Sequence, residues 1–364
     1  MAKVDRSAFE PQSLWVARTF RGLTSTELAK RAGLSRQVVS DLERDEVFFL
    51  PALRAVAAVL RFPLPFFFSK FYVPPKEVLH FRKGARVPEY AIAHARAHAA
   101  LFMRAVRGFR LYADFVDLVP VATAAGSPEH IEHVAALFRA AVKLRTDAPV
   151  EHAIRAAEAS GISVGMFDAQ DPTLQGFACS DDMLAIMLSK QSVWSRRRFS
   201  TMHEVGHLVL HRTPTDPELA EREAHRFAGA VLLPPAAFRR EFPRGRRMNW
   251  AALLAMKERW GVSLQAIVGR ARDLGLIDDA QYRTAFIHIA QNGWRINEPA
   301  EREAEEPSVS RSFLEDLQRE EELGNYCEEM DLYLENVEEA LSLTPPKEET
   351  SRVFLSPLRP RSDL

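Results

Sequence analysis

Two histidines, His203 and His207, stand four residues apart with Glu204 between them. The residues around them recur at helical spacing and predict a partly buried helix capped by Ser200; the apolar ones are Phe199, Met202, Val205 and Val209. Residues four apart share one face of a helix, so both imidazoles can reach a single ion. Neutral imidazole is a natural zinc ligand, and a glutamate beside the ion can take a proton from water. The pattern therefore predicts a metal site on a helix.

A catalytic zinc site needs a third protein ligand and leaves one position for water. The chain after the motif predicts a second helix whose buried stripe is Ala224, Phe227, Ala228 and Val231. Glu221 lies one turn before Ala224, so its carboxylate can point inward. The pattern alone leaves three competing ligands: Glu218, Glu223 and His225.

Together the two motifs resemble those of the ImmA/IrrE metallopeptidases, bacterial cytoplasmic zinc enzymes that cleave transcriptional repressors. The first motif is Arg198-Phe199, His203-Glu204 and Gly206-His207, and the second is Glu221, Ala224, Phe227-Ala228, Leu232 and Pro234. The resemblance extends from Ser127 to Pro299. It implies a zincin-like fold of the gluzincin type, with Zn²⁺ held by His203, His207 and Glu221 and with Glu204 as the general base. His211, one further turn along, would orient a ligand or stabilise an oxyanion.

The N-terminal region predicts short helices joined by tight turns. Thr24 and Glu27 form a capping box, Gly33 permits a turn, and Ser35 caps the next helix. This segment resembles the XRE (lambda-repressor-like) helix-turn-helix family, which implies binding to double-stranded DNA, often as a homodimer. The positions expected to face DNA are Thr24, Ser25, Ser35, Arg36, Gln37 and Ser40. A small helical protein-interaction domain is the alternative interpretation.

The pattern of elements predicts a mainly α fold with a small β-sheet (α+β), in which an all-α helix-turn-helix domain precedes the peptidase domain. Two β-rich apolar runs, Ile162 to Phe167 and Met183 to Leu188, predict strands. The second run is interpreted either as an edge strand beside the active site, able to pair with a peptide, or as an ordinary core strand.

Composition divides the chain into four predicted regions: a helix-turn-helix domain at 1–72, a helical linker at 73–126, the peptidase domain at 127–299 and an acidic, partly helical segment with a mobile tail at 300–364. The linker predicts an Ala-rich helix from Tyr90 to Tyr112, and the acidic segment predicts one amphipathic helix between Phe313 and Leu341. Lys and Arg outnumber Asp and Glu in residues 1–119, and the reverse holds in residues 298–350.

No run of about 18 apolar residues predicts a membrane span. With only Cys179 and Cys327 there is no disulfide framework, which predicts a cytoplasmic protein. The sequence thus predicts a DNA-binding transcriptional regulator whose zinc endopeptidase domain cleaves a repressor-type partner. The alternatives are a non-hydrolytic XRE-type transcription factor and a toxin-antitoxin or phage switch. In both, the peptidase-like domain would sense a ligand, a metal or a partner.

Overall fold

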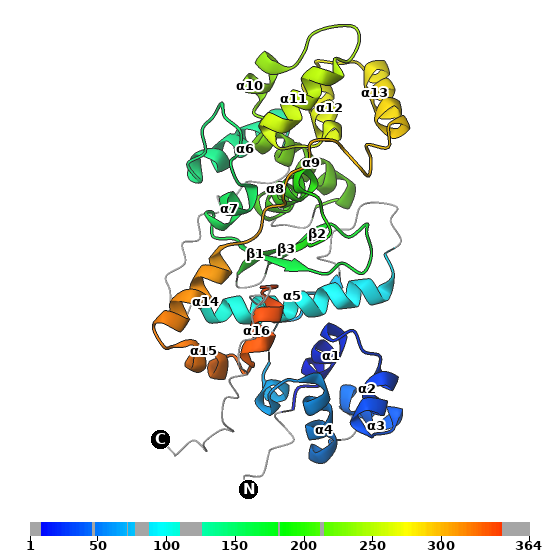
Figure 1. Ribbon diagram of the computed structural model, residues 1–364, viewed down its shortest axis with the longest axis vertical. Coiled ribbons are helices and arrows are strands. Elements are labelled where there is room, and N and C mark those ends of the chain that lie inside the picture. Colours follow the sequence, from blue (N-terminus) through cyan, green and yellow to red (C-terminus); the bar gives the residue numbers. More distant parts are fainter. Residues whose placement is uncertain are drawn as a thin grey trace.

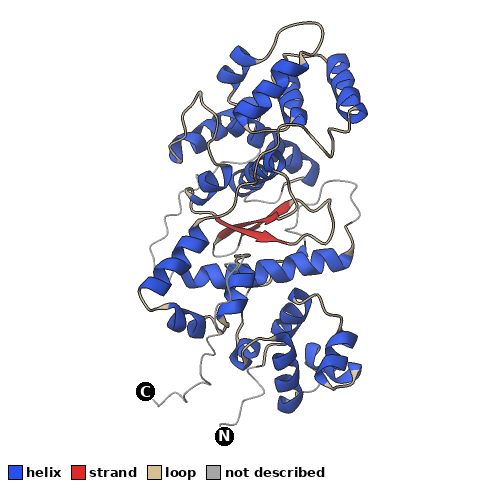
Figure 2. Ribbon diagram, viewed as in Figure 1, coloured by secondary structure: helices blue, strands red, loops and turns tan. Residues whose placement is uncertain are grey.

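A computed structural model describes residues 9–45, 48–70, 72–76, 87–109, 126–180, 183–211 and 215–343 of the protein. Within these residues sixteen α-helices accompany one three-stranded sheet (Figures 1 and 2). The predicted fold class, mainly α with a small sheet, is confirmed. No helix in the described part of the chain is long and apolar enough to cross a membrane.

Four short helices and a 3-10 turn form the N-terminal helical unit: α1 (Pro11–Phe20), α2 (Ser25–Ala32), α3 (Arg36–Glu43), α4 (Leu50–Leu60) and η2 (Leu64–Phe68). Their ends follow the predicted caps. The Thr24 side chain and Glu27 form the capping box of α2, and the Ser35 hydroxyl accepts the hydrogen bond that starts α3. Between them Gly33 adopts a φ of 67°, which a residue without a Cβ tolerates at little cost.

The long helix α5 (Glu89–Phe109) lies between the N-terminal helical unit and the sheet (Figure 1). Its many alanines are buried, which lets α1 on one side and β1 on the other approach its backbone closely. The helix agrees with the Ala-rich helix predicted from Tyr90, and residues 110–112 of that prediction lie outside the described residues.

The sheet contains β1 (Ser163–Phe167), β2 (Gly176–Ser180) and β3 (Leu184–Ser189) in the order β1-β3-β2. Because β3 pairs with β1 in parallel and with β2 antiparallel, it is the central strand. The interpretation of Met183 to Leu188 as an edge strand is therefore wrong, and the alternative of a core strand holds. An apolar run buried on both faces is typical of a central strand. Of the described strands, β2 is the edge strand that packs against α8.

Helices cover the other face of the sheet and extend to the end of the molecule opposite the N-terminal helical unit (Figure 1). In chain order they are α6 (Pro128–Ala141), α7 (Ala153–Glu158), α8 (Trp194–Leu210), α9 (Pro217–Leu232), α10 (Pro235–Glu241), α11 (Trp250–Trp260), α12 (Leu264–Asp273) and α13 (Asp279–Gln291). Ser200 does not cap the histidine helix, because α8 begins almost two turns earlier, after Val193. Arg197 and Arg198 are buried inside that helix.

The acidic C-terminal segment turns back along α5 towards the N-terminal helical unit (Figure 1). It forms three helices, α14 (Val309–Arg319), α15 (Leu323–Glu329) and α16 (Leu334–Ala340), so the prediction of one continuous amphipathic helix is wrong. The breaks coincide with Glu321 and Asp331, whose φ angles are 63° and 48°. Residues 344–364, where the tail was predicted, lie outside the described residues.

Candidate metal centre

The centre is built where α8 crosses α9 at close range. At Gly206 an added Cβ would lie 3.1 Å from the Cα of Ala224 and 3.1 Å from the ring of Phe227. Gly is unfavourable inside a helix by about 1 kcal/mol relative to Ala. The close approach of the α9 backbone explains why the position nevertheless has no side chain, and it brings Glu221 within reach of α8.

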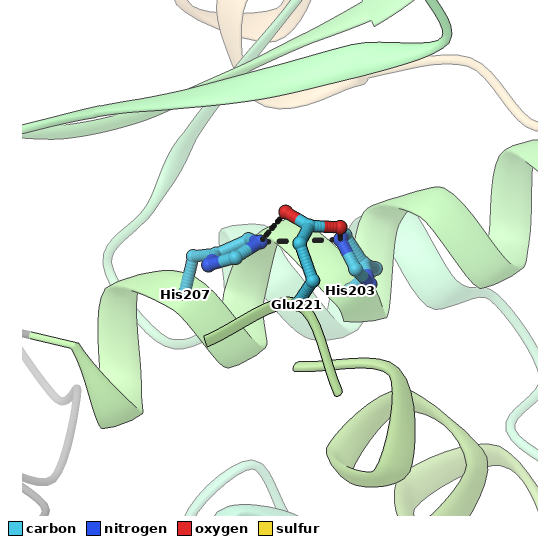
Figure 3. Close-up of side chains that lie close together, drawn as sticks. All are labelled: His203, His207 and Glu221. Atoms are coloured by element: carbon cyan, nitrogen blue, oxygen red, sulfur yellow. Dashed lines mark hydrogen bonds and ion pairs between the residues drawn. The ribbon is translucent and has the colours of Figure 1, made fainter. Parts of the chain in front are cut away.

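Three ligand-type side chains converge at this crossing (Figure 3). The Nε2 atom of His207 lies 3.1 Å from the Nε2 atom of His203 and 3.2 Å from Oε1 of Glu221. The other carboxylate oxygen of Glu221 lies 3.5 Å from His203 Nε2. In the described residues this is the one group of three or more His, Cys, Asp or Glu residues able to hold an ion together.

The pKa values of His203 and Glu221 are both shifted by their contacts with each other and with neighbouring groups. Burial by itself would lower the pKa of His203, but the hydrogen bond with Glu221 and the charges of Glu204 and Glu221 raise it above its usual value. Burial would raise the pKa of Glu221, yet contacts with both histidines hold that pKa well below its usual range. Glu221 is therefore a carboxylate that faces two imidazoles.

Glu204 contacts the sheet at β2. It is buried, and the backbone of Ala178 on β2 forms a hydrogen bond with its carboxylate. Burial raises the pKa of this carboxyl to about 7, the positive charge of His203 lowers it, and the charge of Glu221 raises it. Its Oε2 atom has no partner in the part of the chain that is described. A carboxyl with such a pKa and a vacant oxygen can both accept and return a proton near neutral pH.

His211 belongs to a chain of side chains behind the ligands. Its Nδ1 lies 3.1 Å from Nδ1 of His207, and its Nε2 lies 3.0 Å from Oε2 of the buried Glu223. It is therefore placed to orient His207 rather than to face the three-residue group. The competing ligand candidates lie elsewhere. Glu218 is exposed and faces Arg222, while the ring of His225 packs at a tilt against that of Phe199.

Two features that help to build the centre, Glu223 and β2, are not predicted by the sequence. The role of Glu223 as the partner of His211 has no signal other than its position on α9. The edge strand β2 begins at Gly176 in a stretch without an apolar alternation long enough to predict a strand.

The residues predicted to face DNA fall into two groups in the N-terminal helical unit. The hydroxyls of Thr24 and Ser35 accept capping hydrogen bonds, and that of Ser25 lies 3.4 Å from Glu43. Ser40 accepts a hydrogen bond from Arg44. The side chains of Arg36 and Gln37 are exposed at the start of α3, where the Gln37 amide donates to Asp41 over 2.6 Å.

Comparison with known families assigns a class to the central part of the chain. Residues 157–272 match the model of the IrrE N-terminal-like domain, peptidase family M78. The match runs from the end of α7 to α12 and includes the whole sheet and the α8–α9 crossing. This part of the chain is accordingly metallopeptidase-like. The matched range lies within the longer range, Ser127 to Pro299, over which the sequence resembles the family. A search of curated proteins finds no match to the chain.

Proposed function

We propose that the protein is a zinc-dependent endopeptidase joined to a DNA-binding module, and that it acts on a repressor-type protein. The observation that carries the proposal is the convergence of His203, His207 and Glu221 beside the buried Glu204. Ligand atoms about 2.0–2.1 Å from zinc at tetrahedral angles lie about 3.3 Å apart. His207 Nε2 lies at such separations from His203 Nε2 (3.1 Å) and from Oε1 of Glu221 (3.2 Å), and the other oxygen of Glu221 lies 3.5 Å from His203 Nε2. The donor set of two imidazoles and a carboxylate also suits zinc.

A zinc ion held here would polarise a peptide carbonyl and lower the pKa of a water molecule. Glu204 would take the proton of the attacking water on its vacant Oε2 and then pass it to the leaving amine. Among the described strands β2 pairs only with β3, so its other edge offers an extended peptide a strand to pair with, and Ala178 on β2 contacts Glu204 directly. A substrate paired there would present its backbone to the proton-transferring carboxylate.

The N-terminal helical unit supports the regulatory half of the proposal. In the helix-turn-helix interpretation, α2 and α3 are the two helices of the motif, and the left-handed Gly33 forms the turn between them. The recognition helix α3 would then enter the major groove with Arg36 and Gln37 at its N-terminal end. Arginine suits guanine and glutamine suits adenine. A protein that binds operator DNA in the cytoplasm, alone or as a homodimer, would meet repressor-type substrates there.

The test is cleavage of purified repressors, beginning with those encoded beside this gene, by the full chain with zinc added or chelated. We expect cleavage with zinc, none with chelator, and none by the Glu204→Gln variant, which should still bind zinc because Glu204 is not in the ligand group. Cleavage by Glu204→Gln at the parental rate would show that the base is wrongly assigned. Zinc and DNA binding without cleavage of any candidate would support the sensor or switch alternatives.

A further inference from the structure

The acidic C-terminal segment contacts two distant parts of the molecule, and the first is the metal-bearing helix. Glu301 accepts hydrogen bonds from the backbone nitrogen and the hydroxyl of Ser195, in the first turn of α8, at 3.0 and 2.6 Å. Glu305 forms an ion pair with Arg198 on the same helix. It also accepts hydrogen bonds from the backbone nitrogens of Ala153 (2.7 Å) and Ile154 (3.2 Å), at the start of α7.

This first attachment is buried. Arg198 is 2% exposed and Glu305 is 8% exposed. The wholly buried Lys257 lies 2.9 Å from Glu298 and 2.5 Å from Glu301. Removing one member of a buried ion pair leaves its partner charged and unpaired, which strongly destabilises a protein. The stretch from Glu298 to Glu305 is therefore a permanent anchor on α8 and its neighbours.

The second attachment is made by α16 to the N-terminal helical unit. Glu339 pairs with Arg21, which follows α1, and Glu335 lies 2.5 Å from Arg61, which follows α4. The side-chain amide of Asn336 donates to the carbonyl of Arg61 over 3.0 Å. The apolar side of α16 belongs to the core shared with α5 and the N-terminal helical unit; its buried members are Val337, Ala340 and the adjoining Leu341.

The ion pairs of the second attachment are more exposed than those of the first. The Glu335 and Glu339 side chains are 37% and 43% exposed, and exposed ion pairs are weak and screened by salt. The helix that carries them has only seven residues, too few to persist without its packing partners. When its contacts with α5 and the N-terminal helical unit open, we expect α16 to lose its helical structure as well, because so short a helix depends on its packing.

We propose that α16 is a releasable latch that holds the N-terminal helical unit against α5, while the same segment stays anchored to the metal-bearing helix. Closed, the latch fixes α1 on α5, α5 packs on β1, and the sheet packs on α8. Open, it loosens the N-terminal helical unit, which still contacts α5 directly, while the chain remains tied to α8 through Glu301 and Glu305. The latch does not depend on peptidase activity or on DNA binding, so it can be tested apart from both.

The experiment is hydrogen exchange of the full chain, measured by mass spectrometry at about 50 mM and about 500 mM NaCl, where screening differs several-fold. In the Glu335→Gln/Glu339→Gln variant we expect amides of α16 and of the α1–α5 contact to exchange about three- to tenfold faster at low salt. This is the size of effect expected when two exposed ion pairs are lost. High salt should produce the same change in the parent. Amides of α8 should keep their parental rates.

The matched control is Glu315→Gln/Glu320→Gln, which removes two exposed carboxylates from α14 and its end and should leave exchange unchanged. The charge reversal Arg61→Glu should open the latch, and Arg61→Glu/Glu335→Arg should close it again. Three results would overturn the proposal: no change in α16 and α1, an equal change throughout the chain including α8, or no rescue by the reversed pair.

Discussion

The imidazole of His211 is fixed by Glu223, whose Oε2 lies 3.0 Å from Nε2 of that ring. The carboxylate therefore keeps the Nε2 proton on His211, and its Nδ1 is left as an acceptor for the Nδ1–H of His207, 3.1 Å away. With its proton on Nδ1, His207 presents an unprotonated Nε2 towards His203 and Glu221. One buried carboxylate thus sets the tautomers of two histidines in series.

Replacing Glu223 with Gln should weaken zinc binding without removing a ligand. An amide can donate as well as accept, so the His211 tautomer is no longer enforced, and we expect the zinc affinity to fall about 10- to 100-fold. Competition with a chelator of known affinity measures this. Glu218→Gln, an exposed carboxyl on the same helix, is the control and should bind zinc as the parent does. Equal zinc affinities for the parent and Glu223→Gln would exclude the proposal that Glu223 sets the tautomers of His211 and His207.

Gly206→Ala should push α9 away from α8. The new methyl group would meet the α9 backbone at 3.1 Å, and overpacking of this kind costs about 1–3 kcal/mol, against a helix-propensity gain of up to about 1 kcal/mol. We expect a lower free energy of unfolding and weaker zinc binding, because Glu221 moves with α9.

Gly269→Ala is the matched control for that substitution. Gly269 lies in α12 with nothing within 4 Å of an added Cβ, so alanine should stabilise the protein by about 0.5–1 kcal/mol through helix propensity. Urea unfolding and zinc titration of the two variants give the comparison. If Gly206→Ala were as stable and bound zinc as well as Gly269→Ala, the tight crossing would not be what positions Glu221.

How much of the structure can be predicted from the sequence depends on how local each interaction is. The adjacency of His203 and His207 follows from helix geometry, so spacing alone predicts it. Selecting Glu221 over Glu218 and Glu223 required the family resemblance, because the packing of α9 on α8 is not written in either helix.

Interactions over long sequence separations had no signal at all. Nothing near Arg198 in the sequence indicates that it is buried, because its partner Glu305 lies 107 residues later. The apolar spacing after Phe313 also fits one helix as well as three. The left-handed turns that interrupt it lie at Glu321 and Asp331, where no glycine announces a break.

The proposed DNA binding of the N-terminal helical unit can be tested through Arg36, which is exposed at the start of α3. If this side chain contacts a phosphate or a base edge, Arg36→Ala should weaken binding to duplexes from the region upstream of the gene. The slope of log affinity against log salt should also fall by about 1 if the contact is to a phosphate. Arg283→Ala is the control, because α13 lies at the opposite end of the molecule from α3 (Figure 1). Equal loss in both variants would indicate unspecific attraction of the whole surface.

The buried His98 on α5 should make the folded protein less stable in mild acid. It is 7% exposed, its ring lies 4.4 Å from that of Phe20, and its Nδ1 has no partner among the described residues. Burial, followed by the charges of His94, Lys190 and Arg21, holds the pKa of His98 well below its usual value. Below a pH of about 6.5 the unfolded chain therefore takes up a proton that the folded chain excludes.

Each pH unit below that value should cost up to about 1.4 kcal/mol of unfolding free energy until the folded-state pKa is reached. His98→Phe keeps an aromatic ring against Phe20 and loses no hydrogen bond of Nδ1, so it should remove this contribution and flatten the decline. The measurement is urea unfolding of parent and variant at pH 7.5 and 5.5. A packing defect from the larger ring would change the free energy of unfolding equally at both pH values. The loss of the proton linkage would instead change the difference between the two free energies. An unchanged difference would mean that His98 takes up its proton as readily in the folded protein as in the unfolded chain.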